Sequence, residues 1–181
     1  MDSNGDGIGD LEGIRSKLDY LEELGVGVIW LCPVYTSPNK DNGYDISDYY
    51  GIMKEFGTMG DMYALIQDCK SHNISIMMDL VLNHSSDQHW WFLQSKSSRE
   101  NPYHDYYIWA EAKDGKEPTD EQAFFGGSIW EWNEPTKEYY LHSFSPEQPD
   151  LNWENPKLRK ELYQMIRFWM DLGIEGFRFD A

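Results

Sequence analysis

The sequence is short of basic residues, of cysteines and of long apolar runs. Its 181 residues include 15 Lys and Arg against 32 Asp and Glu, a net charge of −17. Binding to phosphate backbones needs a basic patch, so this charge argues against nucleic acid as a partner. No apolar run approaches the roughly 20 residues that span a bilayer, so we expect no membrane partner. Two cysteines, Cys32 and Cys69, do not make a disulfide framework. We expect a cytoplasmic protein with two reduced, buried thiols.

Three segments have the periodicity of amphipathic helices. Apolar residues recur every three or four positions over 10–25, where a glycine is placed to end the helix. A second helix is expected over 58–73, capped by Thr58 with Asp61 as the reciprocal partner. A third is expected over 155–173, with an Asn-Pro pair at its start. These helices alternate with shorter apolar segments.

The shorter apolar segments have the length of strands. They lie at 26–35, 74–84 and 173–181. The first two lack polar alternation, which favours strands buried on both faces, as in parallel sheets. Residues 85–155, rich in Trp, Tyr, Asp and Pro, have no long periodic segment and indicate an inserted subdomain. The order of elements therefore predicts an α/β fold built from βαβ units.

The final segment, GIEGFRFDA, carries a charged pair within an apolar strand. The side-chain period of two places Arg178 and Asp180 on one face, and Phe177 and Phe179 on the other, toward covering helices. An inward Asp costs desolvation energy unless its charge is compensated, and Arg178 can supply that compensation. An ionised carboxylate at the C-terminal end of a parallel strand suits a nucleophile. A structural ion pair would explain the same pattern.

Polar residues also follow the two earlier strands. Asn83 and His84 end the segment DLVLNH, at the same predicted sheet edge as Asp180. A His there could bind a sugar hydroxyl or act as acid or base, or be satisfied within its own loop. The loop KDNGYDISDYY carries Asp41 and Tyr44, which could contact a polar ligand. Ordinary turn chemistry is the alternative, because Asp-Asn-Gly is a strong turn signal.

The opening segment DSNGDGIGD has oxygen donors at alternating positions. Asp2, Asn4, Asp6 and Asp10, with Gly7 for the sharp turn, suit a hard cation such as calcium. The spacing matches the first half of an EF-hand loop, but the twelfth loop position is a glycine rather than a Glu. We therefore predict a structural calcium loop that leads into a helix. The alternative is a flexible acidic turn.

Taken together and in order, five segments resemble the α-amylase family of glycoside hydrolases, and within it the oligo-1,6-glucosidase and α-glucosidase branch. They are DSNGDGIGD, DNGYDISDY, DLVLNH, QPDLNWENP and GFRFD. The resemblance implies a (β/α)8 TIM barrel with a domain B inserted after the third strand. This chain would hold strands two to four, with barrel parts at 1–84 and 155–181 and domain B at 85–154.

The resemblance also implies roles for individual residues. Asp180 matches the nucleophile that forms the covalent glycosyl-enzyme, and Arg178 matches the Arg that holds it. Asp79 matches a position that is structural. Residues around the terminal glucose ring are matched by Asp41, Tyr44, His84 and, in the segment FFGGS, Phe125. Calcium ligands are matched by Asp2, Asn4, Asp6, Asp10 and the carbonyl of Ile8.

The implied function is that of a retaining glycosidase, monomeric at full length, which releases glucose from the non-reducing ends of short α-glucosides. Such enzymes need a second carboxyl group as acid/base. In the family that Glu follows the fifth strand, so we expect this chain to be a fragment that is inactive and poorly soluble by itself, with open sheet edges. For the linkage, QPDLN favours α-1,6, whereas Ala181, directly after the nucleophile, favours α-1,4.

Two non-catalytic alternatives share some of these features. Some relatives of the branch are amylase-like ectodomains of transporter-associated proteins, which resemble this chain in the calcium loop and in the DYYIW region. A calcium-dependent sugar-binding module would not need Asp180. The joint presence of Arg178, Asp180 and His84 favours an enzyme over the ectodomain, and Asp180→Asn in the complete protein would discriminate an enzyme from the binding module.

Overall fold

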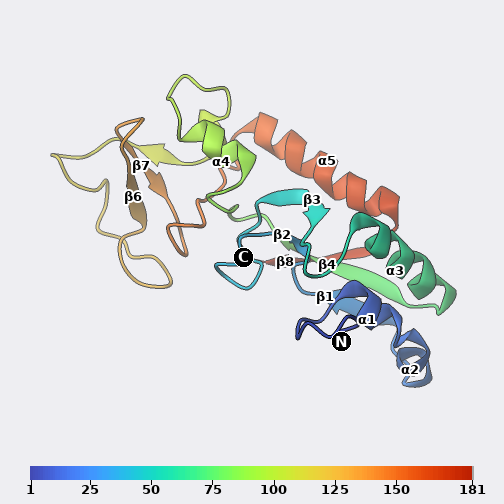
Figure 1. Ribbon diagram of the computed structural model, residues 1–181. Coiled ribbons are helices and arrows are strands. Elements are labelled where there is room, and N and C mark those ends of the chain that lie inside the picture. The colour runs from blue at the N-terminus through green and yellow to red at the C-terminus, as the bar shows by residue number, and fades with distance from the viewer. Residues whose placement is uncertain (181) are drawn as a thin grey trace. The chain divides into compact units, whose positions relative to one another are not determined.

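The computed structural model describes residues 1–180, which form two compact units (Figure 1). The first unit contains residues 1–36, 49–80 and 164–180, and the second contains residues 37–48 and 81–163. Within the described range, no helix is long and apolar enough to cross a membrane.

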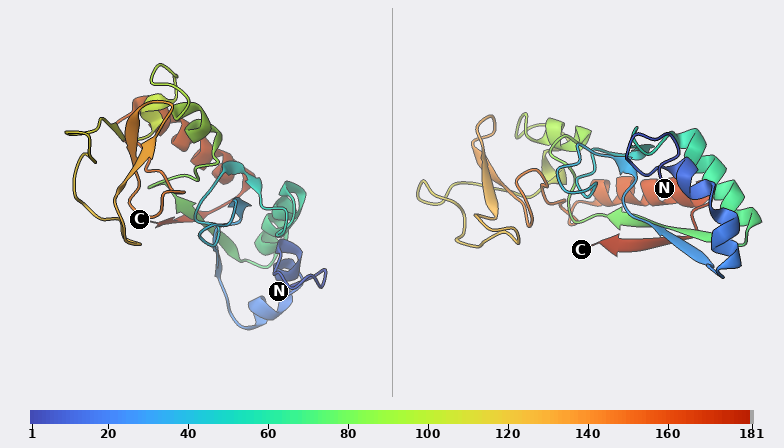
Figure 2. Two further views of the ribbon diagram at one scale, coloured as in Figure 1. Left: turned by 60° about the vertical axis from the view of Figure 1, so that its left-hand side comes forward. Right: turned by 60° about the horizontal axis from the view of Figure 1, so that its bottom comes forward.

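A three-stranded sheet forms the centre of the first unit. It consists of β1 (Val28–Leu31), β4 (Ser75–Val81) and β8 (Gly176–Asp180), in the order β1-β4-β8. β1 pairs in parallel with β4, and the arrows of β4 and β8 run in the same direction in Figure 2. A second, two-stranded sheet joins β2 (Tyr35–Thr36) to β3 (Asp48–Ile52). The predicted parallel α/β arrangement is thus confirmed.

The strands at the sheet's edges are more exposed than we predicted. β1 was expected to be buried on both faces, but Val28 and Trp30 are 54% and 48% exposed, and Cys32 is exposed as well. Phe179 on β8, expected to face a covering helix, is 67% exposed. These predictions were wrong because β1 and β8 are the outer strands of the sheet. Within this sheet, only the central strand β4 is buried along most of its length. Cys69 is buried, as predicted.

Two of the three predicted helices start at their predicted caps. α3 (Met59–Ser71) starts at the predicted capping box, in which Thr58 and Asp61 each bond the other's backbone. α5 (Pro156–Leu172) starts after Asn155, whose side chain accepts from the Lys157 N–H at 2.9 Å.

The predicted helix over 10–25 is instead two short ones, α1 (Leu11–Arg15) and α2 (Leu18–Glu23). The break follows Ser16, whose hydroxyl bonds back to the Gly13 carbonyl at 2.8 Å and so competes with the helical pattern.

Aromatic side chains hold the irregular part of the second unit together. It contains α4 (Trp90–Ser95), the 3-10 helix η1 (His104–Tyr106) and an antiparallel sheet in the order β5-β7-β6. These strands are β5 (Trp109–Ala110), β6 (Trp130–Asn133) and β7 (Glu138–Leu141). The buried Phe92 ring packs against Tyr107 and Tyr140, with centroids 4.9 and 5.0 Å away, and stacks on Trp109 at 6.0 Å.

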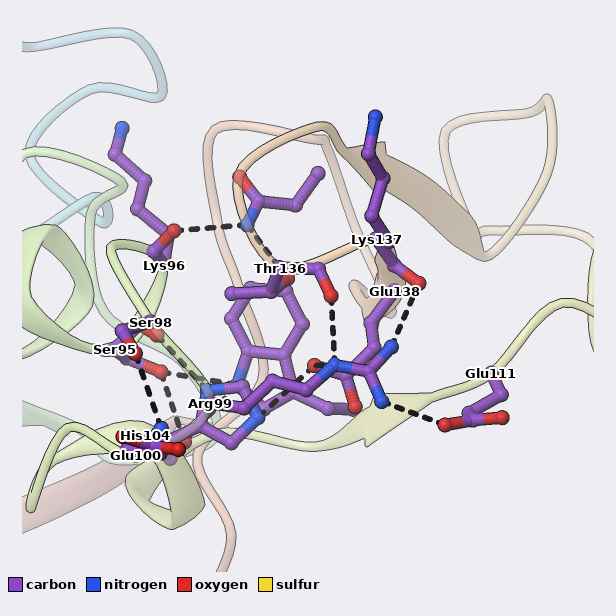
Figure 3. Close-up of polar contacts among 12 residues, drawn as sticks. Ser95, Lys96, Ser98, Arg99, Glu100, His104, Glu111, Thr136, Lys137 and Glu138 are labelled. Carbon is purple, nitrogen blue, oxygen red and sulfur yellow. Dashed lines mark hydrogen bonds and ion pairs between the residues drawn. The ribbon is translucent and has the colours of Figure 1, made fainter.

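A polar cluster reinforces this aromatic core (Figure 3). The buried Glu138 carboxylate lies 3.2 Å from His104 Nε2 and 3.3 Å from Arg99 Nε. The Arg99 guanidinium also donates to the carbonyls of Thr136 at 2.7 Å and Lys137 at 3.0 Å. One guanidinium therefore both compensates a buried charge and fixes the turn between β6 and β7.

Candidate functional site

The first unit gathers four side chains near the carboxyl ends of its parallel strands, here called the strand-end cluster: Trp30, Asp79, Arg178 and Asp180. Arg178 Nη1 lies 2.8 Å from Asp79 Oδ1 and 2.5 Å from Asp180 Oδ1. Asp79 Oδ2 accepts a hydrogen bond from Trp30 Nε1 at 3.2 Å, and the Arg178 guanidinium lies 5.1 Å from the centre of the Trp30 ring. The strand period thus does bring Arg178 and Asp180 together, as predicted.

Burial differs among the charged members of the strand-end cluster. The Asp79 side chain is fully buried, while those of Asp180 and Arg178 are 21% and 39% exposed. Asp79 therefore acts as a fixed internal anion that orients Arg178, in line with its expected structural position. Asp180 keeps partial access to solvent and lies beside the Arg178 guanidinium. A carboxylate in this setting can act as a nucleophile.

The second unit gathers the other predicted sugar-contacting residues in a group here called the loop cluster: Asp41, Tyr44, Asn83, His84, Gln148 and Asp150. His84 Nε2 lies 3.0 Å from the Tyr44 carbonyl oxygen, and its Nδ1 lies 3.2 Å from Asn83 Nδ2. Gln148 Nε2 donates to Asp41 Oδ2 at 2.9 Å and lies 3.1 Å from His84 Nε2. His84 is only 2% exposed, and Gln148 is fully buried.

The loop that carries Asp41 and Tyr44 is shaped by a buried carboxylate that we had not singled out. Asp45, with no exposed surface, accepts hydrogen bonds from Lys40 N at 2.9 Å, from Asp41 N at 3.0 Å and from Ser37 Oγ at 3.0 Å. The turn signal DNG is also real, because Asn42 and Gly43 have φ of 50° and 90°. The loop is therefore both a turn and a support for candidate ligand contacts.

Phe125, predicted to form an aromatic wall of the sugar site, packs together with two other Phe rings. It is 64% exposed, and its ring lies 5.6 Å from that of Phe144, which in turn lies 5.1 Å from the His84 ring. Phe124 stacks on Phe144 at 5.3 Å. Sequence reasoning missed Phe144, because an isolated Phe in a Ser- and Pro-rich stretch gives no periodic signal.

Sequence reasoning also gave no role to Gln148 or Asp150, although both lie in the quoted segment QPDLN. Asp150 is 5% exposed, and burial raises its pKa, whereas hydrogen bonds from Ser143 lower it. The signal was available, since Gln and Asp flank a Pro at the end of an aromatic-rich stretch. Their partners were not predictable, because Asp41 and Asn83 lie 107 and 67 residues away from Gln148 and Asp150, respectively.

The predicted calcium loop folds as a chain of side-chain-to-backbone turns. Asp2 accepts from the N–H groups of Gly5 at 2.7 Å and Gly7 at 2.8 Å, and these bonds lower its pKa. Asn4 and Asp6 each accept from the N–H group two residues on, at 2.9 and 2.8 Å. The loop thus curls around several acceptor oxygens.

The fourth predicted side-chain ligand, Asp10, already has protein partners on both carboxylate oxygens. Its Oδ1 accepts from Gly13 N at 2.6 Å and so caps α1, while its Oδ2 accepts from Ser3 N at 3.0 Å and Ser3 Oγ at 2.8 Å. Among residues 1–180, no group of three or more His, Cys, Asp or Glu side chains is arranged to hold a metal ion.

Comparison with known proteins places this geometry in a family. The oligo-1,6-glucosidases of Parageobacillus thermoglucosidasius and Bacillus cereus are each 61% identical to the chain, over 180 and 181 residues. The chain is matched over 99–100% of its length but spans only 32% of each relative. A solved isomaltulose synthase variant from Erwinia rhapontici NX5, in complex with its natural substrate sucrose, is 58% identical with a TM-score of 0.96. That comparison covers 99% of this chain and 32% of the other. The family model for the alpha-amylase catalytic domain matches residues 1–181, so the chain belongs to the alpha-amylase family of glycoside hydrolases.

Proposed function

We propose that the full-length protein carrying this chain is a retaining α-glucosidase that releases glucose from the non-reducing ends of short α-glucosides. One observation carries the proposal. Arg178 is fixed by the buried Asp79 and lies 2.5 Å from the partly exposed Asp180. This arrangement supplies a charged, accessible carboxylate of fixed orientation, which is what formation of a covalent glycosyl-enzyme requires.

In the proposed reaction the Asp180 carboxylate attacks the anomeric carbon of the terminal glucose. The bond from that carbon to the glycosidic oxygen breaks, and the leaving oxygen takes a proton from a carboxylic acid that the full-length protein must supply. Water then attacks the same carbon, and the resulting proton returns to that acid as the bond to Asp180 breaks. Arg178 stays charged throughout and orients Asp180 for both steps.

The loop cluster is proposed to recognise the sugar. Asp41 can accept hydrogen bonds from glucose hydroxyls, and the half-buried Tyr44 ring can stack on the apolar face of a sugar. Phe125, with its neighbour Phe144, supplies a further aromatic surface. His84 is nearly buried, so we assign it to the support of this loop.

For the linkage we propose a preference for α-1,6. The two relatives at 61% identity are named oligo-1,6-glucosidases, and the segment QPDLN favours the same branch. The opposing cue, Ala181, lies outside the described residues. The similarity to an isomaltulose synthase makes sucrose isomerisation the outcome to be distinguished from hydrolysis.

We also propose that the acidic loop binds a structural calcium ion through Asp2, Asn4, Asp6 and the carbonyl of Ile8. The donor set consists of oxygens, which suits this hard cation. Each of these three side chains uses its oxygens on backbone N–H groups, but carboxylate and amide oxygens have further lone pairs to offer. Asp10 fits a supporting role better, because it caps α1. We further propose that the enzyme is cytoplasmic. We also propose that it is monomeric, which sedimentation of the full-length protein would test.

The test is turnover by the full-length protein on isomaltose, maltose, sucrose and starch. We expect glucose from isomaltose first, with the α-anomer appearing initially in a proton NMR time course, and loss of turnover in Asp180→Asn. Inversion of configuration would contradict the covalent mechanism. Isomaltulose formed from sucrose would indicate an isomerase, and cleavage only within starch would contradict action at chain ends. A sugar-binding module would keep its affinity in Asp180→Asn and would show no turnover in the parent protein.

A further inference from the structure

We propose that Asp150, acting through the side-chain amide of Asn83, holds His84 neutral with its proton on Nε2, so that His84 anchors the loop of Asp41 and Tyr44. Asp150 and Asn83 are then positioning residues rather than catalytic ones. The inference deepens the proposed function, but its main readout needs neither substrate nor turnover.

The backbone first brings the two segments together. His84 and Asp150 form an isolated antiparallel bridge. Leu151 N donates to the Asn83 carbonyl at 2.9 Å, and Ser85 N donates to the Pro149 carbonyl at 3.2 Å. The segments NHSS and QPDLN therefore run side by side with a fixed register, and Asp150 is placed against Asn83 by the main chain.

Asp150 then decides which way the Asn83 amide points. Asp150 Oδ1 lies 3.2 Å from Asn83 Nδ2 and accepts from Ser143 N at 2.9 Å, while Oδ2 accepts from Ser143 Oγ at 2.5 Å. An ionised carboxylate can only accept hydrogen bonds. The NH2 group of Asn83, and not its oxygen, must therefore face Asp150.

The orientation of Asn83 in turn decides the tautomer of His84. The same Nδ2 lies 3.2 Å from His84 Nδ1, so Nδ1 must accept and cannot carry a proton. The other end of the ring gives the same answer, because His84 Nε2 lies 3.0 Å from the Tyr44 carbonyl oxygen, which can only accept. The Asn83 amide thus requires the proton on Nε2, and the Tyr44 carbonyl can accept a hydrogen bond from it.

A protonated imidazolium would conflict with this arrangement. It would place an N–H at Nδ1 against the NH2 group of Asn83, and His84 is 2% exposed, so bulk water could not relieve the conflict. The third neighbour, Gln148, has its NH2 group turned to Asp41 Oδ2 at 2.9 Å. The second hydrogen of that NH2 group faces His84 Nε2 at 3.1 Å and would suit an acceptor there. The contacts with the Asn83 amide and the Tyr44 carbonyl oppose this one and favour the proton on Nε2.

The consequence is a specific role for His84. Its Nε2–H ties the Tyr44 carbonyl to the segment NHSS, and Gln148 ties the Asp41 carboxylate to the same group of side chains. The acid or base role considered for His84 from its position in the sequence is not the one that this geometry favours. His84 instead fixes the position of the loop that carries the proposed sugar contacts Asp41 and Tyr44.

The test is ring 15N NMR of histidine-labelled full-length protein, in which the His84 signal is assigned by its loss in His84→Gln. At neutral pH we expect the pattern of a neutral ring protonated on Nε2. Asn83→Asp places a carboxylate at Nδ1 and should move the proton there. Asp150→Ala frees the Asn83 amide and should give a mixture of tautomers, while Asp150→Asn retains an acceptor oxygen and should restore the parent pattern.

Ser143→Ala is the matched control. It removes the hydroxyl bond to Asp150 Oδ2 but leaves the contact of Oδ1 with Asn83, so the tautomer should stay unchanged. A His84 ring that is protonated on Nδ1 or on both nitrogens in the parent protein would overturn the proposal. An unchanged pattern in both Asp150→Ala and Asn83→Asp would do the same. The parent spectrum decides the tautomer even where a variant fails to fold, and the Asp150 and Asn83 variants decide what sets it.

Kinetics add a second readout, which rests on the proposed function. Loss of the contact from Asp150 through Asn83 to His84 in Asp150→Ala should raise KM for isomaltose by about tenfold, roughly the effect of one lost hydrogen bond in the site. Asp150→Asn should recover most of this loss. If the parent protein has no glucosidase activity, the proposed function fails. The NMR experiment still tests the tautomer of His84, because it needs no substrate. If Asp180→Asn abolishes turnover but the tautomer of His84 does not change in Asp150→Ala and Asn83→Asp, only the role assigned to Asp150 and Asn83 fails.

Discussion

The strand-end cluster and the loop cluster hold their polar side chains by opposite means. In the strand-end cluster one guanidinium joins two carboxylates, one buried and one partly exposed. In the loop cluster the buried imidazole is oriented by amides and a backbone carbonyl. A charged centre needs an opposite charge close by, whereas a buried neutral ring needs only correctly placed donors and acceptors. The first arrangement suits bond-making, and the second suits holding a loop in place.

The same contrast extends to the two units as wholes. The first unit rests on a parallel sheet and on helices with conventional caps, such as the Thr58 capping box. The irregular part of the second unit rests on ring-to-ring contacts around Phe92 and on the Arg99–Glu138 pair. Substitutions should therefore damage the two units through different mechanisms.

The largest expected effect breaks the aromatic core of the second unit. Phe92→Ala should lower the free energy of unfolding by about 3–5 kcal/mol, because the Phe92 ring is 1% exposed and packs against several other rings. Urea denaturation followed by near-ultraviolet circular dichroism would measure it. Phe179→Ala is the control, since that ring is 67% exposed and its loss should change stability by about 0.5 kcal/mol or less. Equal effects of the two substitutions would contradict this account.

The next effect breaks the charged centre of the first unit. Arg178→Ala leaves the buried Asp79 carboxylate without its guanidinium and should cost about 2–3 kcal/mol. We place the cost below that of a fully buried pair because the Arg178 side chain is 39% exposed. Adding Asp79→Asn to this variant should recover part of the loss, since it removes the unpaired charge. A double variant less stable than Arg178→Ala would show that Asp79 matters for reasons other than charge.

Sequence reasoning succeeded where the physics is local. The capping box at Thr58 and Asp61 and the shared face of Arg178 and Asp180 follow from spacing within a few residues. The break after Ser16 was missed although its cause is also local, because helical periodicity continues across it. Local patterns thus predict element type better than element continuity.

What the sequence could not supply were the long-range partners. The contact of Gln148 with Asp41 spans 107 residues, and that of Arg178 with Asp79 spans 99. Exposure of Val28 and Trp30 likewise depends on β1 being an outer strand, which is a property of the sheet and not of the segment. Spacing along the chain carries no information on such pairs.

A third prediction concerns how the stability of the second unit depends on pH through a buried neutral histidine, His89. Burial lowers the pKa of His89 to about 3, and its Nδ1 accepts from Trp91 N at 3.1 Å to cap α4. In the unfolded chain its pKa is about 6.5. Between these values the unfolded chain binds more protons, so stability rises with pH and is lost as pH falls below about 6.5.

The matched variant for this titration is His89→Asn, which keeps a capping oxygen but does not titrate. Between pH 6.5 and pH 5 the parent protein should lose about 2 kcal/mol more stability than the variant. Urea denaturation at a series of pH values would give both curves. Parallel curves for parent and variant would mean that His89 is protonated in the folded protein at no cost.

The smallest expected effect concerns the acidic loop of the first unit. If Asp2, Asn4, Asp6 and the Ile8 carbonyl bind calcium, a tenfold excess over Kd should stabilise the first unit by about 1.4 kcal/mol, and a chelator should reverse this. Asp6→Asn should abolish the response, and Asp171→Asn, an exposed substitution on α5, should not. A thermal shift of Asp6→Asn equal to that of the parent would mean that the loop is only an acidic turn. The stabilisation by calcium can also be followed through the near-ultraviolet signals of the second unit's aromatic core. If calcium stabilises the second unit as much as the first, the two units unfold together and the contrast between them disappears.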